Sequence, residues 1–181
     1  LGVGTTSPYA KLSVAGNGLF DGAVTASSFN ATSSTGYLLN GVTLATGSTT
    51  KNNYFFGAAA INSSVTSGFF NNIAIGLAAL QYATSGGDNI AIGSSALRGM
   101  NAGSGNTGSD NTALGFGTLL LNKSGSYNNA FGRSALNTNS TGSHNNVMGY
   151  QALYFNTTGS YNNAIGYQAS ANWNTTGSYN N

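Results

Sequence analysis

Polar and apolar positions alternate over a short phrase that recurs along the chain. In SYNNAFG (126–132), SHNNVMG (143–149) and SYNNAIG (160–166), a polar pair is followed by a small residue, a large apolar residue and glycine. A two-residue alternation is typical of a strand with one buried face. Gly and Asn recur too often for a stable helix. The phrase therefore predicts a strand of about five to six residues in each copy.

One glycine marks the repeat, and its successive intervals are 19, 17, 22, 17, 17 and 17 residues. A fixed short period is typical of a solenoid. We therefore predict an all-β fold, a parallel β-solenoid (β-roll) of coils of about 17 residues stacked about 4.8 Å apart. A second short strand or arm completes each coil, and the longer intervals hold insertions that bulge at the turns. The marker residues are Gly57, Gly76, Gly93, Gly115, Gly132, Gly149 and Gly166.

The repeat phrases divide the chain into two segments. Residues 51–181 form the repeat array, which stops partway through a copy. Residues 1–50 lack the repeat, but AKLSV (10–14) and GYLLNGV (36–42) have the alternation and turn residues of short strands. We expect a β-rich segment over 1–50 and a solenoid array over 51–181 that is incomplete at its C-terminal end.

Asparagine occupies one equivalent position of the repeat. An amide both donates and accepts hydrogen bonds, so stacked Asn side chains can bond along the column. The alternative is that Asn merely tolerates a turn. The predicted ladder comprises Asn72, Asn89, Asn111, Asn128, Asn145 and Asn162.

A column of large apolar residues also repeats, and it is expected in a trimer interface or in the core. If NNAIGYQA (162–169) is one strand, its even-numbered residues through Gln168 face into the coil and its odd-numbered residues face outward. An exposed apolar column is unfavourable in a soluble monomer, and a closed oligomer would bury it. Arg133 shares the position of Tyr150 and Tyr167, so that position is expected at the rim or beyond a bend at Gly132. The column is Ile75, Ile92, Leu114, Phe131, Met148 and Ile165.

Charge is scarce, which excludes several functions. Charged residues make up 4% of the chain, against about 25% in ordinary proteins. The five cations are scattered singly, so we expect no nucleic-acid partner. There is no cysteine, and therefore no disulfide or thiolate site. No apolar run reaches the length of a membrane span.

Several motifs with catalytic or ligand-binding potential are better explained by the repeat. The motif GSGNTG (103–108) satisfies a dinucleotide pattern, but a repeat strand rather than a helix should follow it. His144 is the single histidine, and it occupies the same position of its copy that Tyr127 occupies in the preceding copy. Asp88 and Asp110 are equivalent residues that could flank a calcium ion, or could simply be solvated turn residues. We therefore expect no enzyme, no cofactor and no metal site.

Aromatic residues remain as candidate contacts. Exposed tyrosines can bind sugars or proteins, or can pack between chains or coils. The ligand-facing candidates are Tyr127, Tyr150, Tyr161 and Tyr167. Six N-x-[ST] sequons are expected by chance in such a composition and predict no glycosylation; they begin at Asn30, Asn62, Asn122, Asn139, Asn156 and Asn174.

The segments GDNIAIGSSAL (87–97) and GSYNNAIGYQA (159–169) resemble head repeats of trimeric autotransporter adhesins, the YadA-like left-handed parallel β-roll. The resemblance covers 68–181, although the period here is longer than is usual in that family. LGVGTTSPYAKLSVAG (1–16) and ASSFNATSSTGYLLNGVTL (26–44) are similar to phage tail-fibre and bacterial surface-fibre segments, which implies a stalk or adaptor. Together they imply a homotrimeric extracellular fibre or adhesin that attaches to a host glycan or protein. The alternative is a phage tail-fibre shaft or receptor-binding segment.

Overall fold

The computed structural model describes four short strands before residue 50 and then residues 52–61, 68–100, 105–170 and 175–180. The chain forms two compact units, 1–30 and 31–181. In the first unit, β1 (Gly2–Val3) and β2 (Ser13–Val14) pair in parallel. β2 falls within the first segment that was expected to be extended. The predicted repeat array lies within the second unit.

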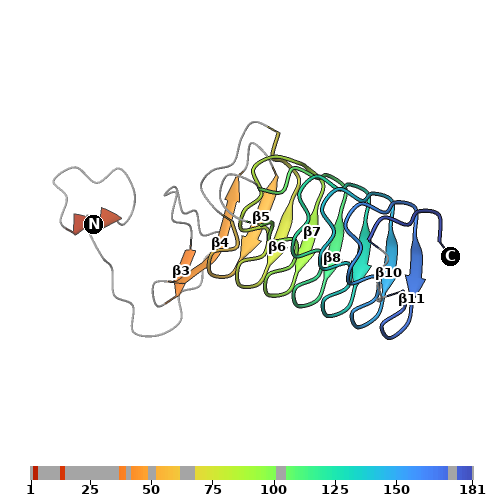
Figure 1. Ribbon diagram of the computed structural model, residues 1–181. Helices are drawn as coiled ribbons and strands as arrows, with labels where there is room; N and C mark the ends of the chain where they lie inside the picture. Colours follow the sequence, from red (N-terminus) through yellow and green to blue (C-terminus); the bar gives the residue numbers. More distant parts are fainter. Residues whose placement is uncertain are drawn as a thin grey trace. The chain divides into compact units, whose positions relative to one another are not determined.

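The second unit is built around one nine-stranded sheet (Figure 1). At one end, β3 (Tyr37–Leu39) and β4 (Val42–Ser48) pair antiparallel, and β4 pairs antiparallel with β5. From β5 onward all neighbours are parallel and in sequence order. These strands are β5 (Asn53–Phe56), β6 (Ile73–Ile75), β7 (Ile90–Ile92), β8 (Thr112–Leu114), β9 (Asn129–Phe131), β10 (Asn146–Met148) and β11 (Asn163–Ile165).

The predicted β-solenoid is confirmed, with one strand per coil and a period of about 17 residues. The strands from β6 onward have three residues, fewer than expected, because each ends at the repeat glycine. Gly132, for example, has a φ of 122° and turns the chain out of the strand direction. Turns, rather than a second strand, complete the coils over the described residues.

The extra residues of the 22-residue interval belong to the return arm, the segment that leads from one strand to the next coil. The Gly99 amide donates to the Leu120 carbonyl, and the Asn106 amide donates to the Tyr82 carbonyl, so the extra residues lie between Gly99 and Asn106. Residues 101–104, where this insertion was predicted to bulge at a turn, lie outside the described residues. The extra residues of the 19-residue interval fall at 62–67, outside the described residues.

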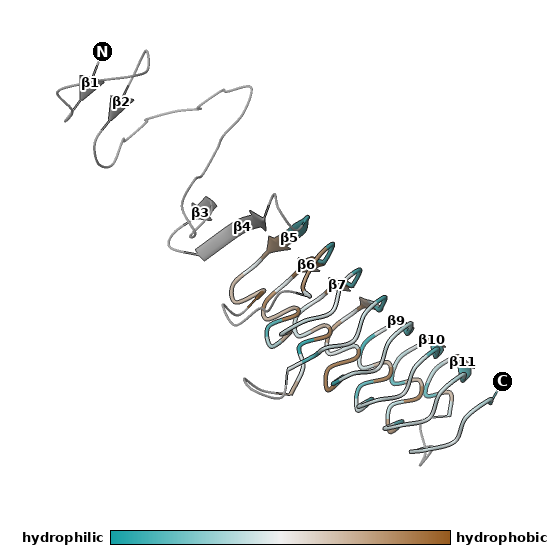
Figure 2. Ribbon diagram, turned by 90° about the horizontal axis from the view of Figure 1, so that it is seen from above, coloured by the Kyte–Doolittle hydropathy of each residue, from teal (hydrophilic) through white to brown (hydrophobic). Residues whose placement is uncertain are grey.

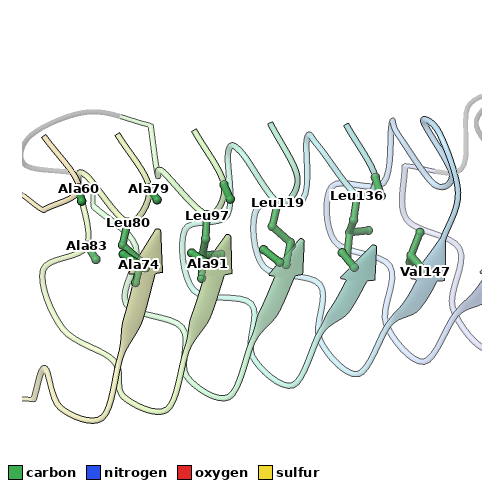
Figure 3. Packing of buried hydrophobic residues seen from close by; sticks show 14 of the residues in the cluster. Ala60, Ala74, Ala79, Leu80, Ala83, Ala91, Leu97, Leu119, Leu136 and Val147 are labelled. Atoms are coloured by element: carbon green, nitrogen blue, oxygen red, sulfur yellow. The ribbon is translucent and has the colours of Figure 1, made fainter. Parts of the chain in front are cut away.

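Small and branched apolar side chains fill each coil. The central residue of the strand is usually alanine, and a leucine from the return arm packs against it (Figure 3). Apolar segments recur at equivalent places of successive coils, with polar turns between them (Figure 2). The stack therefore buries a continuous, narrow core. Its fully buried members include Ala74, Ala91, Ala113, Ala130, Val147, Leu80, Leu97, Leu119, Leu136 and Leu153.

The predicted asparagine ladder is present and buried. In each step the Oδ1 atom of one Asn accepts both the backbone amide and the Nδ2 group of the next. From Asn128 to Asn145 these donor–acceptor distances are 3.1 and 3.0 Å. Asn53 joins the column at one end and Asn180 at the other. Each rung satisfies the polar groups that a buried turn would otherwise leave unpaired.

A second asparagine ladder runs beside the first, and it was not predicted from the sequence. Asn139 Nδ2 donates to Asn122 Oδ1 at 2.8 Å, and Asn156 Nδ2 donates to Asn139 Oδ1 at 2.9 Å. The Gly142 carbonyl accepts one bond from Asn128 and one from Asn139, so it links the two ladders. The Gly125 and Gly159 carbonyls do the same in the adjacent coils.

The coils also use left-handed backbone conformations at residues other than glycine. One such column precedes the Asn ladder, a second follows the strand, and a third is the buried leucine column. Left-handed conformations cost roughly 1–2 kcal/mol for a residue with a Cβ. The second column has φ between 49° and 62° and comprises Ala59, Ala78, Ser95, Ser134, Gln151 and Gln168, with Gly117 at the same place in its own coil.

This column predicts a stabilising substitution. Ser134 has a φ of 57°, and its equivalent in the previous coil is already Gly117. Ser134→Gly should raise the free energy of unfolding by about 0.5–1 kcal/mol, because removing the Cβ relieves the left-handed strain and exceeds the entropy cost of glycine. Urea unfolding measures the gain in the free energy of unfolding, and the m-value should not change.

Ser126→Gly is the matched control. Ser126 is outside the left-handed columns, and its Oγ accepts the Ser109 amide at 3.1 Å. This substitution should lower the free energy of unfolding by about 1 kcal/mol through the lost hydrogen bond. Equal effects of the two substitutions would contradict the role of backbone strain.

Candidate functional site

The outward face of the strand ladder carries the predicted apolar column. Each strand points its central residue inward and its flanking residues outward. The exposed fraction of the apolar side chains ranges from 37% at Ile92 to 63% at Ile165, while Leu114 and Phe131 are half-buried. The column therefore lies outside the coil core. We call it the outer apolar column: Phe56, Ile75, Ile92, Leu114, Phe131, Met148 and Ile165.

A second column on the same face changes character along the stack. It is aromatic or aliphatic on β5 to β7 and polar on β8 to β11, where Asn146 Nδ2 donates to Asn163 Oδ1 at 3.2 Å. The face is thus apolar across its full width at the β5 end and half polar at the β11 end. The column is Tyr54, Ile73, Ile90, Thr112, Asn129, Asn146 and Asn163.

The chain bends after the strand, which corrects one predicted orientation. Gly166 has a φ of 132°, so the alternation expected over 162–169 breaks there. Gln168 was expected to face into the coil but is exposed, and its Nε2 donates to Gln151 Oε1 at 3.0 Å. Ala169, expected to face outward, packs against the core.

The same bend places Arg133 away from the outer apolar column. The Arg133 guanidinium lies 5.4 Å from the centre of the Phe116 ring, at an exposed position. Further along this column, the Tyr150 and Tyr167 rings stack at 5.3 Å. Burial of the strand face would therefore not require burial of this charge.

Another ring column precedes the strands. The Tyr127 and His144 rings stack at 4.8 Å, His144 and Tyr161 at 4.7 Å, and Tyr161 and Tyr179 at 5.0 Å, all within 10° of parallel. Each inner ring therefore has both faces covered by its neighbours and offers its edge to solvent. All four predicted ligand-facing tyrosines are exposed: Tyr127, Tyr150, Tyr161 and Tyr167.

Nothing in the described part of the chain gathers the other candidates into a site. Asp88 and Asp110 occupy equivalent turns, and Asn71 Nδ2 donates to Asp88 Oδ1 at 3.0 Å. The described residues contain no group of three or more potential metal ligands among His, Cys, Asp and Glu. Gly105–Gly108, the described part of the dinucleotide-like motif, leads into β8. His144 is a member of the ring stack.

Three of the six sequons are explained by the second ladder. Asn122, Asn139 and Asn156 are fully buried, and each Nδ2 group donates to the ladder and to a glycine carbonyl. A glycan could not be attached to these amides in the folded chain. The N-x-x-G spacing shared by these copies was the signal of a second column. Asn30, Asn62 and Asn174 lie outside the described residues.

The fold defines the chain as a repeat protein of the parallel β-solenoid class. Comparison with protein-family models, curated proteins and solved structures finds no match. A search for a helix long and apolar enough to cross a membrane finds none among the described residues.

Proposed function

We propose that this chain is a structural segment of a homotrimeric extracellular fibre or adhesin, which provides reach and surface attachment and has no catalytic role. The observation that carries the proposal is the exposed outer apolar column on an otherwise regular solenoid. Its seven rungs span about 29 Å at the usual strand spacing. A continuous apolar surface of this kind marks an interaction site.

The simplest partner for such an apolar face is the same face of another copy of the chain. Closed rotational symmetry would bring the columns together around an axis and remove them from water. Burial alone would be satisfied by two chains, and the resemblance to adhesin head repeats favours three. Charged residues make up 4% of the chain, so few like-charge repulsions would prevent unspecific contacts between exposed apolar faces. Burial of the outer apolar column in a defined oligomer is therefore all the more important.

The coil stack suits a fibre because each coil repeats the same contacts. The strand ladder and the first Asn ladder tie successive coils together, and the second Asn ladder adds bonds between the coils from Asn106 to Asn156, so the stack resists bending at any one coil. The extracellular location and the attachment to a host glycan or protein are supported by the resemblance. The exposed tyrosine edges offer hydroxyl groups for such attachment.

The test is the mass of the chain in solution. We expect a trimer by light scattering, and we expect Ile75→Lys combined with Ile92→Lys to give a monomer. Both side chains are exposed in the single chain, so the double variant should keep its β-type circular dichroism. In a trimer, two lysines on each chain would bring six charges to one axis, and each desolvated charge would cost several kcal/mol.

Thr158→Lys is the matched control, because Thr158 is exposed on a turn away from the strand face. This variant should remain trimeric. A soluble wild-type monomer would refute the assembly, and a monomeric Thr158→Lys variant would show that added charge, rather than the strand face, decides association.

A further inference from the structure

Two tyrosine pairs in this chain are held face to face by the coil repeat. The Tyr161 and Tyr179 rings lie 5.0 Å apart and 4° from parallel, and the Tyr150 and Tyr167 rings lie 5.3 Å apart and 9° from parallel. In each pair the two side chains leave equivalent positions of adjacent coils. Their hydroxyl groups, and the ring carbons beside them, therefore point the same way.

We propose that these two pairs are sites of oxidative coupling to dityrosine, with hydrogen peroxide and a haem peroxidase as the class of oxidant. The inference goes beyond the proposed fibre role and does not rest on it, because each bridge forms within one chain. A bridge would join adjacent coils covalently. The chain has no cysteine, so disulfides cannot serve this purpose.

The backbone holds the partners of each pair in register. The Tyr161 amide donates to the Ser143 carbonyl and the Tyr179 amide donates to the Ser160 carbonyl, both at 3.0 Å, so the two residues have matching places in the ladder. Gln168, next to Tyr167, donates its amide to the Tyr150 carbonyl at 2.8 Å. Holding two reactants in contact raises their effective concentration far above that of free partners.

The rings are also accessible to an oxidant, and the outer ring of each pair is free to tilt. The exposed fraction is 50% for Tyr161, 78% for Tyr179, 37% for Tyr150 and 73% for Tyr167. Exposed side chains reorient on a picosecond to nanosecond timescale. Bond formation requires the two ortho carbons to meet, and a tilt of the outer ring of each pair brings them together.

The coupling balances in atoms and electrons. Each phenol loses its hydroxyl hydrogen, as one proton and one electron, and becomes a phenoxyl radical. The two radicals form one carbon–carbon bond between ortho carbons, and the proton on each of these carbons then moves to the adjacent oxygen. Two phenols and one peroxide give one dityrosine and two waters, so the peroxide takes up both electrons and both protons.

The same structure contains an internal contrast. Tyr127 belongs to the same ring column, but the His144 ring lies between it and Tyr161. Tyr127 therefore has no stacked phenol beside it. The Tyr154 ring meets Phe155 edge-on, at 74°. We expect neither Tyr127 nor Tyr154 to couple within the folded chain.

The experiment treats the full chain, at low concentration, with peroxidase and hydrogen peroxide, and maps the products by mass spectrometry. We expect dityrosine fluorescence, a mass loss of two hydrogens per bridge, and linked peptides that join Tyr161 to Tyr179 and Tyr150 to Tyr167. Tyr161→Phe keeps the ring stack and should remove the first bridge alone. His144→Tyr should add linked peptides that contain residue 144.

The chain unfolded in guanidinium, treated with a chemical one-electron oxidant in place of the peroxidase, is the control for geometry, and its linkages should be scattered over all tyrosines. Three results would overturn the proposal: no bridge in the folded chain under conditions that couple free tyrosine, linkage of Tyr127 in the wild type as often as Tyr161, or bridges that join separate chains. Bridge formation in a monomer would leave this inference standing while refuting the trimer.

Discussion

Replacement of Asn128 by alanine should lower the free energy of unfolding by about 4 kcal/mol. The Asn128 side chain makes four hydrogen bonds: Nδ2 donates to Asn111 Oδ1 and to the Gly142 carbonyl, and Oδ1 accepts the amide and the Nδ2 group of Asn145. At about 1 kcal/mol for each bond the loss reaches this figure. The buried Asn145 amide would also lose its acceptor.

Asn129→Ala is the matched control for the ladder. Asn129 is the next residue of the same copy, but its side chain is exposed on the strand face. Its replacement should change the free energy of unfolding by less than about 0.5 kcal/mol. Chemical denaturation of both variants makes the comparison, and similar losses would show that burial of the ladder contributes little.

Gly132→Ala should be about as damaging, with a loss of about 4 kcal/mol. A Cβ at Gly132 would lie 2.6 Å from the Gly149 carbonyl oxygen and 2.8 Å from its carbon, and backbone atoms cannot rotate away. Its φ of 122° also disfavours any residue with a side chain. Backbone strain of about 1–3 kcal/mol and overpacking of about 1–3 kcal/mol together give this estimate.

Gly117→Ala separates these two causes. Gly117 also has a positive φ, of 62°, but an added Cβ would find its nearest neighbours at 3.5 and 3.7 Å. We expect a loss of about 1 kcal/mol, from backbone strain alone. Thermal melting of both variants provides the measurement. A wild-type melting temperature for Gly132→Ala would show that the coils do not approach as closely as the structure places them.

Much of this architecture is local in origin, and so it could be predicted from the repeat. The period follows from the glycine spacing, because each coil must return the chain to the same point before the next begins. The buried Asn ladder was one of two explanations for an amide-bearing residue that recurs at one position, since stacked amides can satisfy one another. The outward position of Ile165 and its equivalents follows from strand alternation, which holds over the three residues of the strand.

Other features depended on the backbone conformation, which the pattern of residue types does not reveal. Alternation fails at Gly166, where a positive φ exposes Gln168 and buries Ala169. The left-handed conformations of leucine and alanine were unforeseeable, because both residues ordinarily avoid that region. Contacts with the stacked coils around these residues offset the strain of the left-handed backbone.

The same distinction applies to the two candidate surfaces, the outer apolar column and the tyrosine columns. The amino-acid sequence determined by itself which residues recur at one position, and hence that the apolar residues and the tyrosines would form columns. Only the tertiary structure decided that the tyrosine rings stack face to face and present their edges to solvent. It also decided that the amides of three sequons are buried and hydrogen-bonded in a second Asn ladder. The reason is that contacts between coils depend on distance and side-chain direction in three dimensions, and one-dimensional spacing specifies neither.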